Sequence, residues 1–395
     1  MAYTAQFSTD RILTTHAGSL PRPKDLEDMI WARYTGVPVD QKAFANRVAG
    51  AVTDIVKQQQ KTGIDIVDDG EVGKVSFVTY VIERLEGVSP KLGSARSPWA
   101  NSREMQSFPE FYSAAQNQGA SGALRSNRMV CTGPLKYKGH DKVKTDIKNL
   151  NAALKAAGLT EGFIPCISPT NVEDWIGNEY YKTQDDYLYA VADAMHEEYK
   201  AVADAGLIVQ IDDPRLVTYY ITHPEASVKQ CRAWAESRVE ALNHALRGIP
   251  EEQIRFHTCY SINMGPRVHD MELKDIVDII LKINAGAYSF EAANPRHDHE
   301  WRVWRDVKIP NDRILIPGLV THSSVLVEHP QLVADRITNF ASVVGKERVI
   351  AGTDCGFATF AGQHEIHPSI AWAKLKSLAD GAKIASKQLW SKRAR

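Results

Sequence analysis

The sequence of 395 residues lacks the features that would suit it to a membrane, a nucleic acid or an oxidising compartment. Its 47 Lys and Arg balance 48 Asp and Glu, so no basic field is available for phosphates or anionic lipids. No apolar run approaches the ~18 residues of a membrane span, and no signal-peptide pattern stands at the N-terminus. The five cysteines contain no CxxC pair and do not indicate a disulfide framework. We therefore expect a cytoplasmic protein that binds neither nucleic acid nor membrane, with thiols free to bind metal.

What the sequence does contain is a regular alternation of short apolar runs and longer amphipathic stretches. This pattern is typical of βα units around a parallel sheet. Eight runs qualify as core strands: Ile12–Ser19, Ile64–Glu71, Phe163–Ser168, Leu207–Asp213, Ile254–Tyr260, Ala287–Ala292, Ile314–Val320 and Val349–Cys355. Eight such units predict an α/β fold, the (β/α)8 TIM barrel, as a single catalytic domain over residues 1–395.

The stretch from residue 72 to residue 162 is too long for a plain connection between the second and third strands. Within it Met129–Lys138 has the pattern of a further strand and Val143–Ala157 that of a helix. We predict that 72–162 is an excursion over or beside the barrel mouth, with a strand pair and a loop. The alternative is that Met129–Lys138 is a barrel strand and that one of the eight runs is not.

The candidate strands end in polar, titratable or thiol groups. His257 and Cys259 lie two residues apart on one strand, so their side chains point to the same side. The C-terminal ends of all barrel strands meet at one rim, where Glu291 and Cys355 would join this pair. One imidazole, two thiolates and one carboxylate form a four-coordinate set for Zn²⁺, and a ligand that can leave makes such a site catalytic.

Each of these residues also has a less specific interpretation. A buried cysteine is usually a small apolar side chain, which is our interpretation of Cys131, Cys166 and Cys231. A closed structural zinc site in a non-catalytic barrel is a further alternative, but structural sites usually have clustered ligands such as CxxC. That alternative also leaves the acids and the histidine at other strand ends without a role.

Seven segments resemble the cobalamin-independent methionine synthase family, in the right order from about residue 11 to residue 360. Four resemble its zinc-binding half: His257-Thr-Cys-Tyr260, Tyr288-Ser-Phe-Glu291, Gly318-Leu-Val-Thr-His322-Ser and Asp354-Cys-Gly356. Three resemble its amino-acid-binding elements: Thr15-His-Ala-Gly-Ser-Leu-Pro-Arg22, Asp69-Gly-Glu71 and Gln210-Ile-Asp-Asp-Pro214. The family has a TIM-barrel fold, in agreement with the strand count.

The resemblance implies a role for each matching residue. The zinc ligands would again be His257, Cys259, Glu291 and Cys355. His322 would be the general acid, a task that suits an imidazole with an unperturbed pKa of ~6.5. A loop histidine exposed to water is the alternative for His322.

The resemblance also implies how an amino-acid thiol would be recognised. Glu71 and Asp212 would hold the amino group of homocysteine, and the backbone around Ala17 to Ser19 would hold its carboxylate. Two solvated carboxylates, or two that orient zinc ligands, are the alternatives for the acidic pair. The implied activity is zinc-dependent methyl transfer to homocysteine, with a methylated folate or a methyl-corrinoid protein as donor.

The chain departs from the full-length synthase in ways that point to a shorter branch of the family. By this resemblance we expect only the catalytic half, without the N-terminal barrel that helps the synthase to bind folate, and the spacing from Cys259 to Glu291 is longer. This branch includes epoxyalkane:coenzyme M transferase, so coenzyme M with an epoxide is the second hypothesis. The sulfonate of that thiol would need cations, for which Arg22, Lys74 and Arg215 follow three strands. A homo-oligomer is compatible with the sequence, which does not determine the oligomeric state.

Overall fold

The computed structural model describes residues 7–91, 99–113, 128–262, 264–310, 312–362 and 366–391. Eight short strands form its central sheet: β1 (Leu13–Thr14), β2 (Val67–Asp68), β5 (Gly162–Ile167), β7 (Ile208–Asp212), β8 (Ile254–Thr258), β9 (Ala287–Phe290), β10 (Ile314–Val320) and β11 (Ile350–Thr353). All neighbours are parallel, in the order β1-β11-β10-β9-β8-β7-β5-β2. The amide nitrogens of Asp65 and Ile66 donate to Thr14 O at 3.0 and 3.1 Å, linking the first and last strands of this order. The sheet therefore curls into the predicted (β/α)8 barrel, and all eight predicted strands belong to it.

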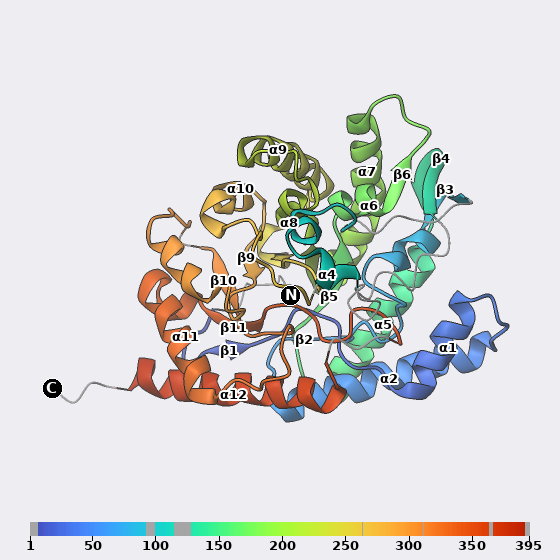
Figure 1. Ribbon diagram of the computed structural model, residues 1–395. Coiled ribbons are helices and arrows are strands. Elements are labelled where there is room, and N and C mark those ends of the chain that lie inside the picture. Colours follow the sequence, from blue (N-terminus) through green and yellow to red (C-terminus); the bar gives the residue numbers. More distant parts are fainter. Residues whose placement is uncertain are drawn as a thin grey trace.

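Helices surround the strands (Figure 1). They are α1 (Lys24–Tyr34), α2 (Gln41–Thr62), α3 (Arg103–Ser107), α4 (Pro109–Ser113), α5 (His140–Ala157), α6 (Pro169–Trp175), α7 (Gln184–Asp204), α8 (Arg215–Thr222), α9 (Val228–Ala245), α10 (Val277–Ile280), α11 (Pro330–Val344) and α12 (Pro368–Trp390). Helix α2 shows how the sequence sets their limits. The Asp40 carboxylate accepts hydrogen bonds from the amides of Lys42 and Ala43 in the first turn, and Gly63 ends the helix at φ +100°.

The apolar pattern of residues 273–285 predicts a helix, but the helix in the structure is shorter. The stretch 273–285 contains a 3₁₀ turn at Leu273–Asp275 and only four α-helical residues, Val277–Ile280. Ile276 separates the two at φ −137°. Buried β-branched residues dominate this stretch, and such residues have restricted side-chain rotamers in a helix, so packing against the barrel outweighs helical regularity.

The predicted strand at 129–138 lies in a second, smaller sheet. Strand β4 (Arg128–Tyr137) pairs antiparallel with β3 (Leu85–Lys91) and parallel with β6 (Ile176–Asn178). The alternative that it is a barrel strand is therefore wrong. Helix α5 packs on α2 and α7, and the small sheet lies beside α7 (Figure 1). Residues 92–98 and 114–127 lie outside the described residues, so the place of 72–162 at the mouth and the single domain over 1–395 stay predictions.

The barrel interior is closed at one end and polar at the other. An apolar cluster comes from residues in or just before the strands: Leu13, Ile66, Phe163, Ile208, Ile314, Ile316 and Ile350. The larger core lies between strands and helices. Because the apolar cluster fills the N-terminal end of the barrel, the polar strand ends are left to form a site at the other end.

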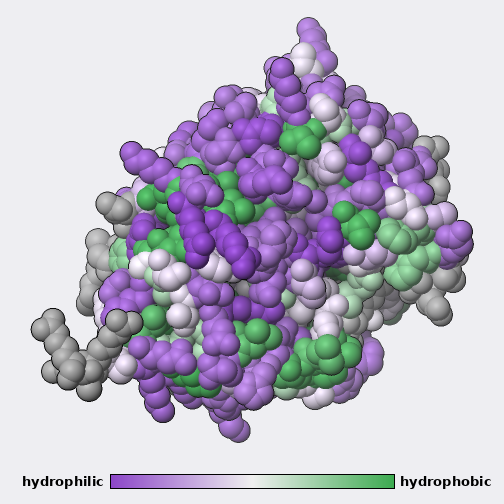
Figure 2. All heavy atoms as spheres, turned by 60° about the vertical axis from the view of Figure 1, so that its left-hand side comes forward, coloured by the Kyte–Doolittle hydropathy of each residue, from purple (hydrophilic) through white to green (hydrophobic). Residues whose placement is uncertain are grey.

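The outer surface shows no candidate for a membrane span: none of the described helices is long and apolar enough. On the face turned forward in Figure 2, hydrophilic residues predominate and hydrophobic patches lie between them. Val325, Leu326 and Val327, which follow β10, are the clearest run of exposed apolar residues.

Candidate active site

A pocket at the C-terminal ends of the strands gathers most of the predicted site residues. It is lined by Ala17, Ser19, Glu71, Asp212, His257, Cys259 and Cys355. These residues come from the ends of β1, β2, β7, β8 and β11. The pocket therefore joins the candidate metal ligands to the candidate groups for an amino acid, while Glu291 and His322 lie outside its lining.

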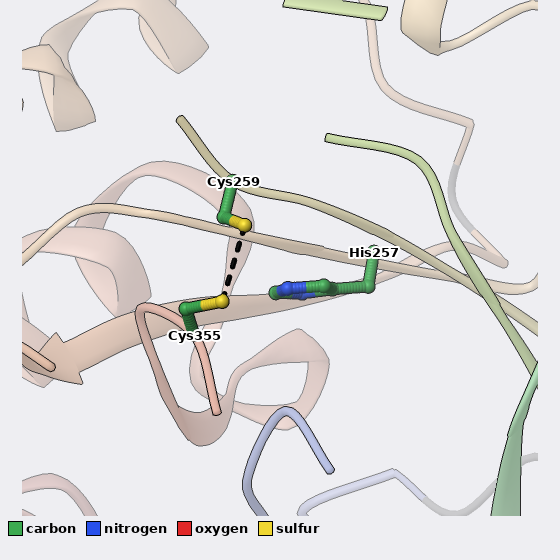
Figure 3. A group of neighbouring side chains, drawn as sticks. All are labelled: His257, Cys259 and Cys355. Carbon is green, nitrogen blue, oxygen red and sulfur yellow. Dashed lines mark hydrogen bonds between the residues drawn. The ribbon is translucent and has the colours of Figure 1, made fainter. Parts of the chain in front are cut away.

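His257, Cys259 and Cys355 converge on one point. Their ligand atoms lie within 4.8 Å of one another, and the two Sγ atoms are 3.2 Å apart (Figure 3). His257 Nδ1 lies 3.0 Å from Ser289 Oγ, whereas its buried Nε2 has no hydrogen-bond partner among the described residues. Burial, with a contribution from the charge of Arg255, lowers the pKa of His257 to about 3. A neutral imidazole with an unpaired nitrogen beside two sulfur atoms fits zinc.

The two thiols are close enough to affect each other. The hydrogen bond with Cys259, followed by burial, raises the pKa of Cys355. Both cysteines are free rather than disulfide-bonded. A divalent cation between the sulfur atoms would stabilise both thiolates by its charge, because a coordinated thiol loses its proton outright.

Glu291, the fourth predicted ligand, has other partners in this structure. Its Oε1 accepts a hydrogen bond from Tyr260 N at 2.8 Å, and its Oε2 lies 3.0 Å from Arg267 Nη2. Asn294 Nδ2 is a third, longer contact, 3.4 Å from Oε2. The carboxylate lies beside the three-residue group without belonging to it, and its role as a zinc ligand stays a prediction.

A buried chain of alternating charges continues from Glu291. Arg267 pairs with Asp270 at 3.0 Å, and His297 lies between Asp270 and Glu300 at 3.0 and 2.8 Å. Although burial lowers the pKa of His297, its hydrogen bonds to Asp270 and Glu300 raise it to about 9. His297 is therefore a buried cation between two carboxylates.

The two acids of the pocket, Glu71 and Asp212, are both buried. Gln210 Nε2 donates to Asp212 Oδ1 at 2.7 Å and to Ala17 O at 2.6 Å, which orients the Asp212 carboxylate. Glu71 has φ +52°, a left-handed conformation that typically costs a non-glycine residue on the order of 1 kcal/mol. Burial raises the pKa of both carboxyls, and the charge of Glu71 raises that of Asp212 further. An ammonium group between them would offset this cost.

Two backbone amides of the loop after β1 already have hydrogen-bond partners. Ala17 N donates to Thr353 Oγ1 at 3.0 Å, and Gly18 N lies 3.2 Å from His16 Nδ1. Ser19 O accepts from Phe357 N at 2.9 Å, which fixes Ser19 against the segment after Cys355. The position of Ala17 and Ser19 in the pocket agrees with the prediction, and their contact with a carboxylate stays a prediction.

His322 is buried rather than exposed to water. Its Nε2 lies 3.2 Å from Ser261 O, so Nε2 carries the proton, and Nδ1 has no hydrogen-bond partner among the described residues. Burial and the charge of Arg267 lower the pKa of His322 to about 4. The expectation of a pKa near working pH does not hold in this structure, because the imidazole is buried and the charge of Arg267 disfavours its protonation.

Several site residues had no separate signal in the sequence. Arg255, two residues before His257, stacks on Phe163 inside the barrel, with Cζ 4.2 Å from the ring centroid, and donates to Thr15 Oγ1 at 2.9 Å. A charged residue within an apolar strand is the one signal that could have indicated it. Arg267 lies in the segment between Cys259 and Glu291. The unusual length of this segment could indicate that it belongs to the site, but it does not identify Arg267.

Asp354 connects two of the strand ends that carry predicted ligands. Its Oδ1 accepts hydrogen bonds from Ala292 N and Ala293 N, both at 2.8 Å. It thereby ties the residue before Cys355 to the segment after Glu291. Gly318 lets this contact form, since a Cβ there would lie 2.1 Å from Asp354 Oδ1 and 2.6 Å from its Cα.

Gly318→Ala is therefore expected to destabilise the protein by about 1–3 kcal/mol and to lower its zinc content, because the added methyl displaces Asp354. Thermal denaturation and metal analysis after gel filtration measure both effects. Gly50→Ala is the matched control: a Cβ at Gly50, within α2, meets nothing within 4 Å, and alanine should stabilise the helix by about 0.5–1 kcal/mol. Equal melting temperatures for the two variants would contradict the prediction.

The fold and the site together define a (β/α)8 barrel protein with a His/Cys/Cys group and an acidic pair in one pocket at the strand ends. The sequence matches the family "Cobalamin-independent synthase, Catalytic domain" over residues 135–379, more than half of the chain. The chain belongs to this family.

Individual relatives agree with this assignment. The methionine synthase of Sulfolobus acidocaldarius is 24% identical over 381 residues, with 96% of this chain and 94% of the relative covered. The B12-independent methionine synthase of Shewanella sp. W3-18-1, solved with selenomethionine, superposes with a TM-score of 0.73 at 20% identity, covering 97% and 100% of the chains. A putative B12-independent methionine synthase from Listeria monocytogenes gives 0.64 at 18% identity, covering 99% and 100%. The structural likeness supports the barrel fold.

Proposed function

We propose that the protein is a zinc-dependent methyltransferase that transfers a methyl group to the thiol of homocysteine. One observation carries this proposal: a single buried pocket holds the His257, Cys259 and Cys355 group together with Glu71 and Asp212. The relatives are named methionine synthases, which supports a methyltransferase and a thiol amino acid as acceptor. A structural zinc site would not need the acidic pair beside it.

The residues of the pocket divide the work of binding the thiol. His257, Cys259 and Cys355, with Glu291 as a fourth and exchangeable ligand, would hold zinc. Zinc, when bound, would lower the pKa of the substrate thiol from its usual ~8.5, so that the nucleophilic thiolate is present at neutral pH. Glu71 and Asp212 would pair with the ammonium group, and a buried pair of acids gives that contact most of its strength.

His322 would act on the methyl donor. A methyl on a tertiary amine is a poor electrophile until the leaving nitrogen is protonated; the new S–C bond then forms as the N–C bond breaks. With its proton on Nε2, His322 has Nδ1 free among the described residues to take up a proton. Because its pKa is about 4 here, this role requires that the bound donor raises the pKa.

Coenzyme M with an epoxide is the second candidate, and the charges near the pocket count against it. The three cations named for the sulfonate have protein partners: Arg22 donates to Ala358 O at 2.6 Å, Lys74 to Pro165 O at 2.7 Å, and Arg215 lies 3.1 Å from Asp174. The pocket lining holds two acids and, among the described residues, no cation. An anionic tail would be repelled there, whereas an ammonium would be attracted.

The test is thiol binding to protein that carries cobalt in place of zinc. Homocysteine is expected to change the thiolate-to-metal charge-transfer band at lower concentration than coenzyme M or glutathione. Methionine is then expected when the zinc protein receives homocysteine with methyltetrahydrofolate or methylcobalamin, as measured by mass spectrometry. If coenzyme M gives the tighter response, and thioether forms from an epoxide but methionine does not form, the second candidate replaces the first. A band that no thiol perturbs would rule out both.

A further inference from the structure

Both carboxylate oxygens of Glu291 have hydrogen-bond partners outside the group of His257, Cys259 and Cys355. Tyr260 N binds one carboxylate oxygen at 2.8 Å and Arg267 Nη2 binds the other at 3.0 Å. Both side chains of the ion pair are buried, with 0% of Glu291 and 4% of Arg267 exposed. A buried carboxylate with two charge-assisted or backbone donors is in a stable conformation of its own, and is not merely turned away from the cluster.

We propose that Arg267 is a positioning residue that binds the Glu291 carboxylate whenever a substrate thiol occupies the fourth coordination position. The inference rests on the proposed function and deepens it, because it names the group that makes Glu291 exchangeable. In one state Glu291 would be a metal ligand; in the other it would keep the ion pair with Arg267 that this structure shows.

The energetic reason lies in the low polarity of the site. A carboxylate that leaves a cation and stays buried without a new partner is strongly unfavourable, because its charge is left uncompensated. Arg267 removes that penalty, since its guanidinium is always charged and already oriented. Exchange of the carboxylate for a thiolate sulfur then replaces one charge-compensated arrangement by another.

Arg267 is itself held for this task from the opposite side. Its Nε binds Asp270 Oδ2 at 3.0 Å, and that carboxylate also contacts His297 Nε2 at 3.0 Å. The backbone of Arg267 has φ +62°, which a non-glycine residue adopts only where the surroundings enforce it. Its Nη1 has no hydrogen-bond partner among the described residues, so the guanidinium has an unused donor beside Glu291.

A purely supporting role for Arg267 makes the opposite prediction. Groups that orient a metal ligand usually strengthen metal binding, and their loss weakens it by about 10–100-fold. If Arg267 instead competes with zinc for Glu291, its loss should hinder the replacement of Glu291 by the substrate thiol, while zinc remains bound. The two roles therefore differ in the sign of the effect on the metal and in the effect on the thiol.

The experiment compares zinc ligation and thiol binding in wild type, Arg267→Gln, Arg267→Lys and Arg296→Gln. Arg296→Gln is the matched control, because Arg296 holds the same loop through Arg267 O and Val268 O without touching Glu291. X-ray absorption at the zinc edge counts sulfur and oxygen donors with and without homocysteine. The charge-transfer band of the cobalt protein gives the midpoint of the thiol titration, and a chelator gives the rate of metal loss.

In wild type and Arg296→Gln, one oxygen or nitrogen donor (a light donor) of zinc should be replaced by sulfur when homocysteine is added. Arg267→Gln should keep its light donor, lose zinc no faster than wild type and need about tenfold more homocysteine, a change of 1.4 kcal/mol. Arg267→Lys keeps the charge without the planar fork and should shift the midpoint less, which preserves the test if Arg267→Gln does not fold.

Two results would overturn the inference. Both Arg267 variants could exchange a zinc donor for sulfur as wild type does, with the wild-type midpoint of the homocysteine titration. That result would show that Glu291 needs no second partner. Faster zinc loss in these variants would show that Arg267 supports ligation. If wild type itself shows no donor exchange with homocysteine or any other thiol, the proposed function fails first, so the two failures are distinguishable.

Discussion

Cys355→Ser is expected to lose zinc and, with it, at least about 10³-fold of the methyl-transfer rate. A serine hydroxyl is a hard donor that stays protonated, so it does not replace a thiolate on zinc. Without the metal only a few per cent of a thiol with pKa ~8.5 is ionised at neutral pH. The thiol also loses its fixed position relative to the methyl group, and such positioning can supply several kcal/mol of the barrier reduction.

The control for this variant is Cys231→Ser. Cys231 is also buried, but it lies on α9 and is not among the residues that line the pocket. It should retain one equivalent of metal by elemental analysis after dialysis, and wild-type formation of methionine by mass spectrometry. A Cys355→Ser protein that keeps one equivalent of zinc would show that the ligand set is wrong. His257→Ala should behave as Cys355→Ser does.

The second large effect is expected from Asp212→Asn, which should lower kcat/KM for homocysteine by about 10²-fold. Removal of one member of a buried charge pair typically costs 2–5 kcal/mol, and 1.4 kcal/mol corresponds to a factor of ten. Asparagine has the same shape, and its amide oxygen can still accept the hydrogen bond that Gln210 Nε2 gives to Asp212 Oδ1. The loss should therefore come from the charge.

A substrate without an amino group provides the control for Asp212→Asn. With 4-mercaptobutyrate, which keeps the thiol and the carboxylate of homocysteine, wild type and variant should differ little. Steady-state kinetics with both thiols and a zinc determination complete the comparison. An equal loss with both thiols would instead assign Asp212 a structural role, and no loss with homocysteine would remove it from the amino-group site. Glu71→Gln should change the selectivity in the same direction.

The burial of His322 has a consequence for any pH profile. Its pKa of about 4 lies below the ordinary value because burial disfavours the imidazolium. At neutral pH His322 is thus a neutral donor through Nε2 to Ser261 O. A basic nitrogen of the methyl donor next to Nδ1 would favour the protonated imidazole and raise its pKa. The pKa that governs catalysis therefore belongs to the complex with the methyl donor and not to the free protein.

The sequence by itself determined the architecture and the position of the site within it. Apolar periodicity is a local property, so the eight core strands could be recognised one at a time, and the His257 and Cys259 pair followed from the two-residue repeat of one strand. Barrel topology then requires all strand ends to meet at one rim. For that reason Cys355, Glu71 and Asp212 could be assigned to a common pocket before the structure was known.

Only the tertiary structure decided how the groups at that rim are partnered. The 3.2 Å contact between Cys259 and Cys355 joins residues that are almost a hundred positions apart in the chain. The ion pair of Glu291 with Arg267 depends on the path of an irregular loop, which no periodicity encodes. The burial of His322 and the charge of Arg267 lower the pKa of this imidazole, whose Nε2 contacts Ser261 O. Charge and hydrogen bonding at these distances depend on long-range packing, which is why the sequence indicated the residues but not their partners.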